Sequence, residues 1–362
     1  MKRMITWMAA ALAAAIMFLP VKVNALSAER AILLDADTGR VLLEKNADMK
    51  SLIASTTKIM TALIVCEQCN VLDRMTIPKE AVGIEGSSMY LQAGEILTVQ
   101  DLLYGLMLRS GNDAAVALAI YCGGTVEGFA QLMNDKARKL GLTGTHFENP
   151  HGLDSPEHYS TARDLALLTA YAMKNPVFAK TVSAKVVSIG SRRIQNHNKL
   201  LWRLAGADGV KTGYTKAAGR ILVSSAMRSG RRLIAVTIDA PDDWNDHAHM
   251  IDSGFRNYKC KQIVTAGDRV GTRSVVGGTI AQVDLLATED FCYSLADNES
   301  VDLVLGGGSF VFAPVTAGEI AGKLYICLKD KVIGEIPLIY GENIEIAEEI
   351  KVPFWKSLLG VK

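Results

Sequence analysis

The sequence predicts two structural units: an α/β (α+β) unit in which helices pack on an antiparallel sheet, and after it a small all-β unit. Two strand-turn-strand patterns stand far apart in the chain, with helical patterns between them. After Tyr258 the pattern changes to short β-type runs separated by Gly, Asp and Asn. At 362 residues the chain also exceeds the usual size of one domain, so two domains are expected, and a sizeable core is available.

The first unit is expected to open with a β-hairpin, because apolar runs at 31–35 and 41–43 flank the turn sequence ADTGR. Thr98 and Asp101 form a capping box, and the sequence SGND interrupts the helical pattern that follows. The helices expected in this part of the chain lie at 52–67, as two consecutive helices within 98–124, and at 126–140.

A polar, aperiodic loop is expected at 145–161, and Thr161 with Asp164 starts another helix after it. From Lys185 the period changes to two, and the runs ILVSSAM and RLIAVTID flank RSGR as a second hairpin. The sequence DDWNDHAHMIDSGFRNY then predicts a helix that closes the first unit.

The N-terminus has the layout of a signal peptide, with Lys2 and Arg3 before an apolar run that ends at Leu19, and small residues up to Ala25. A transmembrane anchor is the alternative, but the run is shorter than the roughly 20 residues that a spanning helix needs. We therefore expect an exported protein that acts outside the cytoplasmic membrane. The expected division is 1–25 signal peptide, 26–258 α/β unit, 262–350 β-rich unit and 351–362 C-terminal tail.

The composition argues against nucleic acid as a partner and against a fold held by a disulfide framework. The formal net charge is only +1, so no single-sign field favours nucleic acid. Six cysteines are too few and too scattered for a disulfide framework. Cys66 and Cys69 form a C-x-x-C at the end of a helical pattern, and we interpret them as core or helix-end thiols instead of a metal or redox site.

The first candidate motif is S-x-x-K at Ser55 and Lys58, near the start of the expected helix at 52–67. Residues three apart on a helix share a side, and here that side also carries apolar residues, so both are expected to face the core. Desolvation lowers the pKa of a buried lysine and makes it a usable base for an adjacent serine. Ser55 as a helix cap and Lys58 reaching solvent is the competing interpretation.

Two further motifs follow in order. SGN, at Ser110 and Asn112, offers a hydroxyl that can relay a proton and an amide that can hold a substrate carbonyl, although both residue types are also common helix caps. KTG, at Lys211, Thr212 and Gly213, offers a cation for a carboxylate, a hydroxyl, and room for a substrate backbone. It would also supply a second positive charge near Lys58. A solvated lysine in a turn or strand is the alternative.

The three motifs together, in this order, are the pattern of penicillin-binding proteins and class A β-lactamases. The chain resembles the low-molecular-mass penicillin-binding proteins, which are D-alanyl-D-alanine carboxypeptidases of the S11 serine peptidase type. The resemblance covers roughly residues 28–258 and includes the blocks NPHGLD, YSTARDLALL and ADGVKTGYTKAAGRILVSSA. It implies the serine β-lactamase/DD-peptidase-like fold for the first unit, and the β-rich unit resembles that family's C-terminal domain more loosely.

The resemblance implies a role for each motif residue. Ser55 would be the nucleophile that forms an acyl-enzyme, Lys58 its base and Ser110 a proton relay. Asn112 would bind the substrate backbone, and Lys211 with Thr212 and Gly213 the terminal carboxylate region. The backbone N–H groups of Ser55 and Tyr214 would form the oxyanion hole. The implied substrate is a peptidoglycan stem peptide ending in D-Ala-D-Ala, β-lactams are the implied inhibitors, and no metal or cofactor is required.

Three alternatives remain at this stage. A Ser-His-Asp site or a metal pair would need His151, or His247 with His249, but the last two lie on different faces of a helix. A class A β-lactamase would need a glutamate-held water, and the loop between the second and third motifs has only Glu148 and Glu157, neither in that class's pattern. A non-catalytic β-lactam sensor is the third alternative.

The C-terminal tail VPFWKSLLGVK places apolar residues on one helical side with lysines around them. The resembled family often ends in an amphipathic membrane anchor, so peripheral membrane contact is one interpretation of this tail. Loose packing or disorder is the other, because the apolar face is small. The apolar residues are Phe354, Trp355, Leu358 and Leu359.

Overall fold

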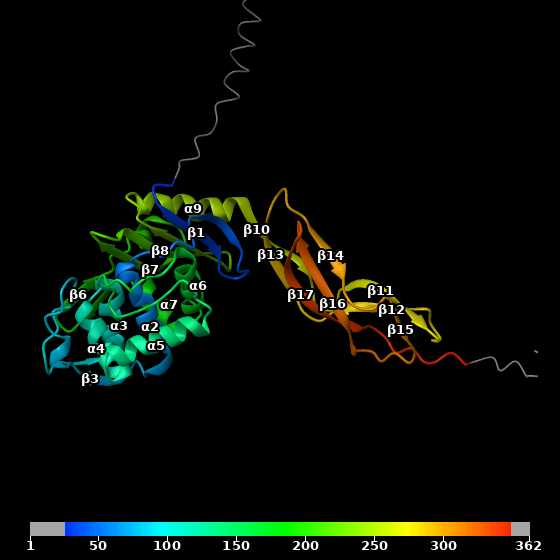
Figure 1. Cartoon of the computed structure of the whole chain (residues 1–362), viewed down its shortest axis with the longest axis horizontal. Coiled ribbons are helices and arrows are strands. Elements are labelled where there is room, and N and C mark those ends of the chain that lie inside the picture. The colour runs from blue at the N-terminus through cyan, green and yellow to red at the C-terminus, as the bar shows by residue number, and fades with distance from the viewer. Residues whose placement is uncertain (1–25, 349–362) are drawn as a thin grey trace, which may run out of the picture.

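The computed structural model describes residues 26–348. The expected signal peptide and the expected C-terminal tail lie outside these residues. Two bodies are visible, an α/β unit and a β-rich unit, and the chain passes from one to the other where α9 (Asp243–Asn257) runs directly into β10 (Tyr258–Val264) (Figure 1). The sequence-predicted antiparallel α/β class followed by an all-β unit is confirmed.

The α/β unit is built on a five-stranded sheet in the order β2-β1-β9-β8-β7, with every neighbouring pair antiparallel. Both predicted hairpins are present, as β1–β2 and β8–β9. The sheet brings together strands from both ends of the unit, and β7, which carries the KTG sequence, lies at its edge. The strands are β1 (Arg30–Asp35), β2 (Val41–Lys45), β7 (Ala207–Thr215), β8 (Gly219–Arg228) and β9 (Arg231–Ile238).

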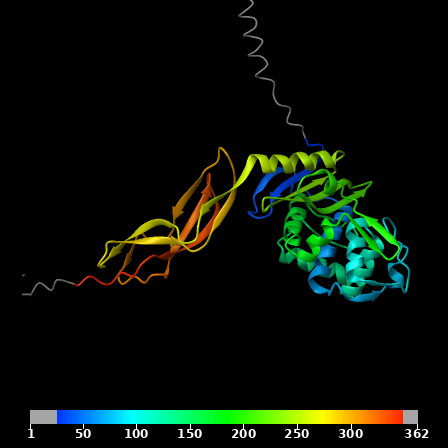
Figure 2. The ribbon, with the colours of Figure 1, turned by 180° about the vertical axis from the view of Figure 1, so that it is seen from behind.

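Helices cover both faces of this sheet (Figure 2). Because side chains alternate along a strand, Ile32 and Leu34 of β1 enter the larger core beneath the helical layer, while Leu33 enters a smaller core beneath α9. The helical layer contains α2 (Lys58–Gln68), α3 (Val99–Tyr104), α4 (Asn112–Gly123), α5 (Val126–Lys139), α6 (Ala162–Ala172) and α7 (Pro176–Ser183). Shorter elements are η1 (Ala54–Thr57), η2 (Lys79–Ala81), η3 (Gly105–Arg109), α8 (Leu200–Arg203), and the small hairpins β3 (Arg74–Thr76) with β4 (Ile96–Thr98) and β5 (Val186–Ile189) with β6 (Arg192–Gln195).

Local sequence signals set most of the helix ends. The capping box of Thr98 and Asp101 is formed in both directions, and Thr161 accepts a hydrogen bond from the Asp164 N–H at the start of α6. Gly124, with φ of 76°, ends α4. Within residues 26–348 no single helix is long and apolar enough to cross a membrane; α4 and α5 reach that length and composition only when joined across a bend of 81°.

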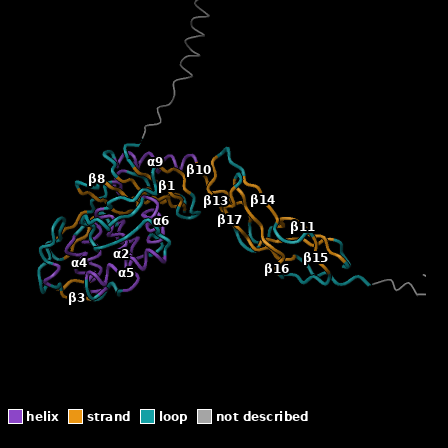
Figure 3. The backbone as a smooth tube through the Cα atoms, in the orientation of Figure 1, coloured by secondary structure: helices purple, strands orange, loops and turns teal. Residues whose placement is uncertain are grey.

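The β-rich unit contains strands joined by loops, with no helix among its described residues (Figure 3). Its main sheet has the order β14-β16-β17-β12-β11-β15, in which only the β11–β15 pair is parallel, and β10 pairs separately with β13. Arg40 of the α/β unit forms a two-point ion pair with Glu299 across the junction of the two units. The strands are β11 (Arg269–Val276), β12 (Gln282–Ala287), β13 (Phe291–Ala296), β14 (Val301–Leu305), β15 (Phe310–Phe312), β16 (Ile320–Leu328) and β17 (Lys331–Tyr340).

Candidate active site

Ser55 lies in the 3₁₀ turn η1, and the regular helix α2 begins only at Lys58. Lys58 is completely buried, as the sequence predicted. Ser55 does not face the core as expected; it is half-buried and lines a cleft, because η1 packs beside the edge strand β7 and not within the helix layer. The residue before it, Ala54, has a positive φ of 44°, which is a strained backbone for an alanine.

The Lys58 amine contacts three oxygen atoms from three separate parts of the chain. Its Nζ lies 3.1 Å from Ser55 Oγ, 2.7 Å from Asn112 Oδ1 and 2.6 Å from the backbone oxygen of His151. Burial lowers the pKa of Lys58 well below its usual value, and the positive charge of Lys211 lowers it further. Sequence reasoning missed the His151 carbonyl, since a backbone oxygen leaves no residue-type signal.

The second motif approaches this amine at the break between η3 and α4. Asn112 also donates from Nδ2 to Glu85 O at 2.5 Å, and its backbone N–H donates to Ser87 O at 2.7 Å. Ser110 lines the cleft and holds the left-handed conformation, with φ of 65°. Residues at positive φ other than glycine cost free energy and are often found at functional sites.

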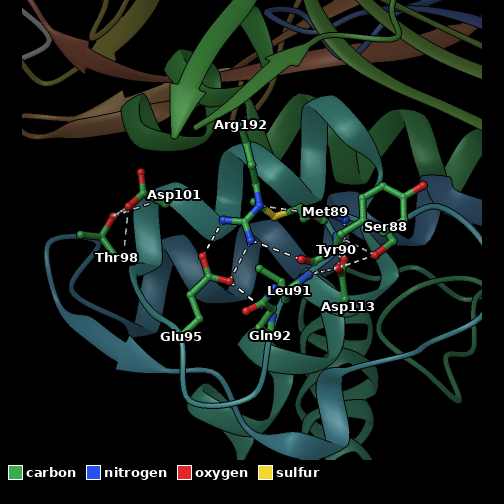
Figure 4. A network of polar contacts seen from close by, with 10 residues as sticks. All are labelled: Ser88, Met89, Tyr90, Leu91, Gln92, Glu95, Thr98, Asp101, Asp113 and Arg192. Carbon is green, nitrogen blue, oxygen red and sulfur yellow. Dashed lines mark hydrogen bonds and ion pairs between the residues drawn. The ribbon is translucent and has the colours of Figure 1, made fainter. Parts of the chain in front are cut away.

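Asp113 fixes the loop that contacts Asn112 (Figure 4). Its buried carboxylate accepts hydrogen bonds from the backbone N–H groups of Met89 and Leu91 and from Ser88 Oγ. Asp113 directly follows the SGN motif, but no sequence pattern marked it as a functional residue. Acidic residues are common in the first turn of a helix because they interact favourably with the helix dipole. The residue type therefore did not indicate the hydrogen bonds that Asp113 makes to a distant loop.

Arg192 of β6 holds the same loop from the other side (Figure 4). Its guanidinium forms a two-point ion pair with Glu95 at 2.5 and 2.8 Å. It also donates to the backbone oxygens of Met89 and Tyr90 at 3.1 and 3.2 Å. The loop over residues 85–95 is therefore held by two charged side chains from distant elements, and no local sequence pattern predicted this arrangement.

The third motif forms part of the edge strand β7. Lys211 is buried, its Nζ donates to Thr212 O at 2.8 Å, and burial lowers its pKa to about 7. A Cβ atom on Gly213 would lie 3.3 Å from Ser55 N, so the missing side chain is what lets β7 approach the nucleophile's backbone. Tyr214 is 66% exposed at the cleft.

A cleft of about 1050 Å³ joins residues of all three motifs. Among the described residues that line it there is no glutamate, and the Glu148 carboxylate accepts a hydrogen bond from Ser155 instead. Lys58, Asn112 and Lys211 lie behind the lining. The motif residues on the cleft surface are Ser55, Ser110, Thr212, Gly213 and Tyr214.

His151 and His247 do not form a second catalytic group with Ser55. His247 is completely buried, where Nδ1 lies 2.5 Å from Ser224 Oγ and Nε2 lies 2.9 Å from Thr237 Oγ1. Burial lowers its pKa to about 3, so this histidine is a neutral part of the core. His151 contributes to the site through its backbone oxygen.

Comparison with known proteins agrees with this geometry. The family model described as D-alanyl-D-alanine carboxypeptidase matches residues 18–242, and the model of the penicillin-binding protein 5 C-terminal domain matches residues 258–346. The chain belongs to the D-alanyl-D-alanine carboxypeptidase family. The resemblance seen in the three motifs is thereby confirmed.

Individual members of this family are similar over most of their length. D-alanyl-D-alanine carboxypeptidase DacC of Escherichia coli is 36% identical over 336 residues, which cover 87% of this chain and 83% of that protein. DacF of Bacillus subtilis is 31% identical, over 92% of this chain and 89% of that protein. The crystal structure of penicillin-binding protein 5 from Haemophilus influenzae superposes with a TM-score of 0.77 at 31% identity, and covers 90% of this chain and 99% of that one.

Proposed function

We propose that this chain is a serine-type D-Ala-D-Ala carboxypeptidase that removes the terminal D-alanine from peptidoglycan pentapeptide stems through an acyl-enzyme on Ser55. The observation that carries the mechanism is the set of contacts made by the Lys58 amine. Family membership supports the activity, and the contacts support the assignment of roles to residues.

Lys58 acts as the base in its neutral form. A neutral amine has two N–H bonds and one lone pair, whereas the ammonium ion has three donors and no acceptor. Asn112 Oδ1 and the His151 carbonyl can only accept, so they take the two N–H bonds. The lone pair is then left for Ser55, whose hydroxyl donates to it across the 3.1 Å contact. The lowered pKa of Lys58 favours this neutral form.

Acylation follows from this arrangement. Ser55 Oγ attacks the carbonyl carbon of the peptide bond between the two D-alanines, and its proton passes to Lys58 Nζ. The C–N bond then breaks, and Ser110 relays the proton that Lys58 took from Ser55 to the leaving D-alanine amine. Water hydrolyses the resulting ester, which regenerates Ser55 and releases a stem that is one residue shorter.

The other motif residues bind the substrate and stabilise the tetrahedral intermediate. Asn112 binds the substrate backbone, and Lys211 with Thr212 receives the terminal carboxylate beside Gly213. The N–H groups of Ser55 and Tyr214 donate to the tetrahedral oxygen, where one such donor is typically worth about 3 to 4 kcal/mol. The short approach of Gly213 to Ser55 N supports this placement of β7.

The absence of a glutamate from the described cleft lining supports slow hydrolysis of a penicilloyl ester, in contrast to a class A β-lactamase. β-Lactams are therefore expected to acylate Ser55 and to remain bound for long periods.

One experiment separates the three candidate functions. The purified protein is incubated with a pentapeptide ending in D-Ala-D-Ala, and free D-alanine is measured beside hydrolysis of a chromogenic cephalosporin. We expect D-alanine release, which a folded Ser55→Ala variant loses together with penicillin labelling. Rapid cephalosporin hydrolysis without D-alanine would indicate a β-lactamase, and labelling alone would indicate a sensor.

The cell wall substrate implies an extracytoplasmic location, with residues 1–25 as the signal peptide and 351–362 as a peripheral membrane contact. Cell fractionation tests both parts. The full chain is expected with the membrane fraction, and a chain that ends at Ile350 is expected to be released from it. A truncated chain that stays with the membrane would contradict the role of the tail.

A further inference from the structure

Helices α2 and α4 run parallel, and the catalytic residues occupy only one end of this pair. Lys58 and Asn112 are the first residues of the two helices, and they are joined by a hydrogen bond of 2.7 Å. At the other end Cys69 caps α2, and Cys122 lies in the last turn of α4. The two helices are thus in contact near both of their ends.

Several contacts bring the two cysteines together. Cys122 Sγ lies 3.5 Å from the Oε1 atom of Gln68, the neighbour of Cys69 in the chain. The hydroxyl of Tyr121, the residue before Cys122, donates to Asp73 Oδ2 at 3.0 Å. Residues on both sides of Cys69 in the chain, Gln68 and Asp73, thus contact the end of α4. Each of the two thiols shifts the pKa of the other, as expected for neighbouring sulfur atoms. Both side chains are only partly buried, so a small oxidant has access to them.

We propose that Cys69 and Cys122 are a disulfide-forming pair, which closes when the protein meets an oxidant that itself carries a disulfide bond. The C-x-x-C noted in the sequence is then not the reactive pair. Its first member, Cys66, lies one helical turn earlier and is mostly buried, and burial raises the pKa of its thiol to about 12. The neighbouring Cys122 thiol lowers the pKa of Cys69, which favours Cys69 as the attacking thiolate.

The reaction balances as two thiol–disulfide exchanges. The Cys69 thiolate attacks one sulfur of oxidised glutathione, and one glutathione leaves as the mixed disulfide forms. The Cys122 thiolate then attacks the Cys69 sulfur, and the second glutathione leaves. Two electrons pass to the oxidant, and the two protons of the protein thiols are taken up by the two glutathione thiolates.

The bond would clamp the pair of helices that holds the catalytic amine. It closes a long chain loop, and such cross-links stabilise a native protein mainly by restricting the unfolded chain. For a protein of this size that stabilisation corresponds to a rise in Tm of about 5 to 10 °C. Penicillin labelling of Ser55 is expected to persist in both redox forms, since the bond lies at the opposite end of α2 and α4.

Peptide mapping tests the pairing directly. The purified protein is treated with oxidised glutathione, its free thiols are alkylated, and the unreduced digest is examined by mass spectrometry. We expect a cross-linked peptide pair that joins residues 69 and 122, with the rise in Tm reversed by dithiothreitol. Cross-linking of Cys66 to Cys69 instead, or recovery of both Cys69 and Cys122 as alkylated thiols, would overturn the proposal.

Variants separate this bond from general oxidation. Cys69→Ser and Cys122→Ser are expected to lose the rise in Tm, and Cys122→Ser is expected to retain glutathione on Cys69. Cys66→Ser is the matched control, because it removes a neighbouring thiol of the same helix and should leave the rise in Tm intact. If Cys66→Ser does not fold, Cys292→Ser in the β-rich unit provides the control. A rise in Tm that persists in Cys69→Ser would contradict the assignment.

Discussion

The surroundings of Ser55 and the core of the β-rich unit differ in what they bury. Around Ser55 the protein buries Lys58, Lys211 and Asp113. The core of the β-rich unit is mainly aliphatic, with side chains such as Leu324 and Leu338 from strands whose buried and exposed positions mostly alternate. Arg273 is buried there as well, and its guanidinium donates to the backbone oxygen of Gly306. Burying a charged group lowers the stability of the folded state, whereas burying an aliphatic group raises it. The buried residues around Ser55 therefore serve catalysis, whereas those in the core of the β-rich unit mainly stabilise the fold.

Backbone strain also occurs around Ser55, although it is not confined to this region, since Lys329 of the β-rich unit has a positive φ of 56°. Ala54 and Ser110 hold positive φ angles directly beside the catalytic groups. Such conformations persist only where surrounding contacts hold them, and here those contacts come from β7, the loop over 85–95 and α4. Substitutions in the two regions should consequently affect different measurements, and four of them test this.

The largest loss of activity is expected from Lys58→Ala, which removes the base. We expect D-alanine release and penicillin labelling to fall by about 1,000-fold or more, with the fold retained. The labelling rate and the circular dichroism spectrum check this. Lys79→Ala, which removes an exposed lysine of the same unit, is the control and should change neither. Retained labelling in folded Lys58→Ala would rule out the proposed base.

Asp113→Asn is expected to have an intermediate effect of about 10- to 100-fold on acylation. The asparagine amide has one acceptor oxygen instead of two, and its NH₂ group faces backbone N–H donors. The hydrogen bonds that hold the loop over 85–95 are therefore weakened, and with them the contacts between this loop and Asn112. Stopped-flow labelling with a fluorescent penicillin measures this. Asp101→Asn makes the same chemical change at the α3 capping box and should leave the acylation rate unchanged, although it lowers stability. Equal effects of the two variants would contradict the role of the loop.

Lys211→Gln is expected to move the pH dependence of acylation. The charge of Lys211 lowers the pKa of Lys58, so removing that charge raises the pKa of Lys58 and shifts the acid limb of the profile to higher pH. The difference should be largest below pH 7, because the pKa of Lys211 itself is about 7. Profiles of kcat/KM from pH 5 to 10 test this, with the exposed Lys216→Gln as control. An unmoved acid limb would exclude electrostatic coupling of the two lysines.

The smallest effect on activity is expected from Leu324→Ala in the β-rich unit. Leu324 is completely buried, and its truncation should lower the free energy of unfolding of that unit by about 2 to 5 kcal/mol. Urea unfolding and limited proteolysis measure the loss, while penicillin labelling should stay within about twofold under native conditions. Leu63→Ala in α2 is the matched change in the catalytic core and should reduce both. Parallel loss of labelling in Leu324→Ala would show that the two regions are coupled.

The sequence by itself determined the elements whose cause is local. The caps at Thr98 and Thr161, the two hairpins and the order of the three motifs depend on residues only a few positions apart, so their patterns can be seen without a fold. Family resemblance in the same motifs was sufficient to identify the activity. The hydrophobic periodicity also located the change to the β-rich unit near Tyr258.

The tertiary structure alone decided how the amine of Lys58 is held. Its partners Asn112 and His151 stand 54 and 93 residues away in the chain, and one of them is a backbone oxygen. The pKa of a lysine depends on how far water is excluded and on which charges lie near it, and both are properties of the packed molecule. The same reason applies to Asp113 and to Cys69 with Cys122, since no local pattern brings two distant segments together.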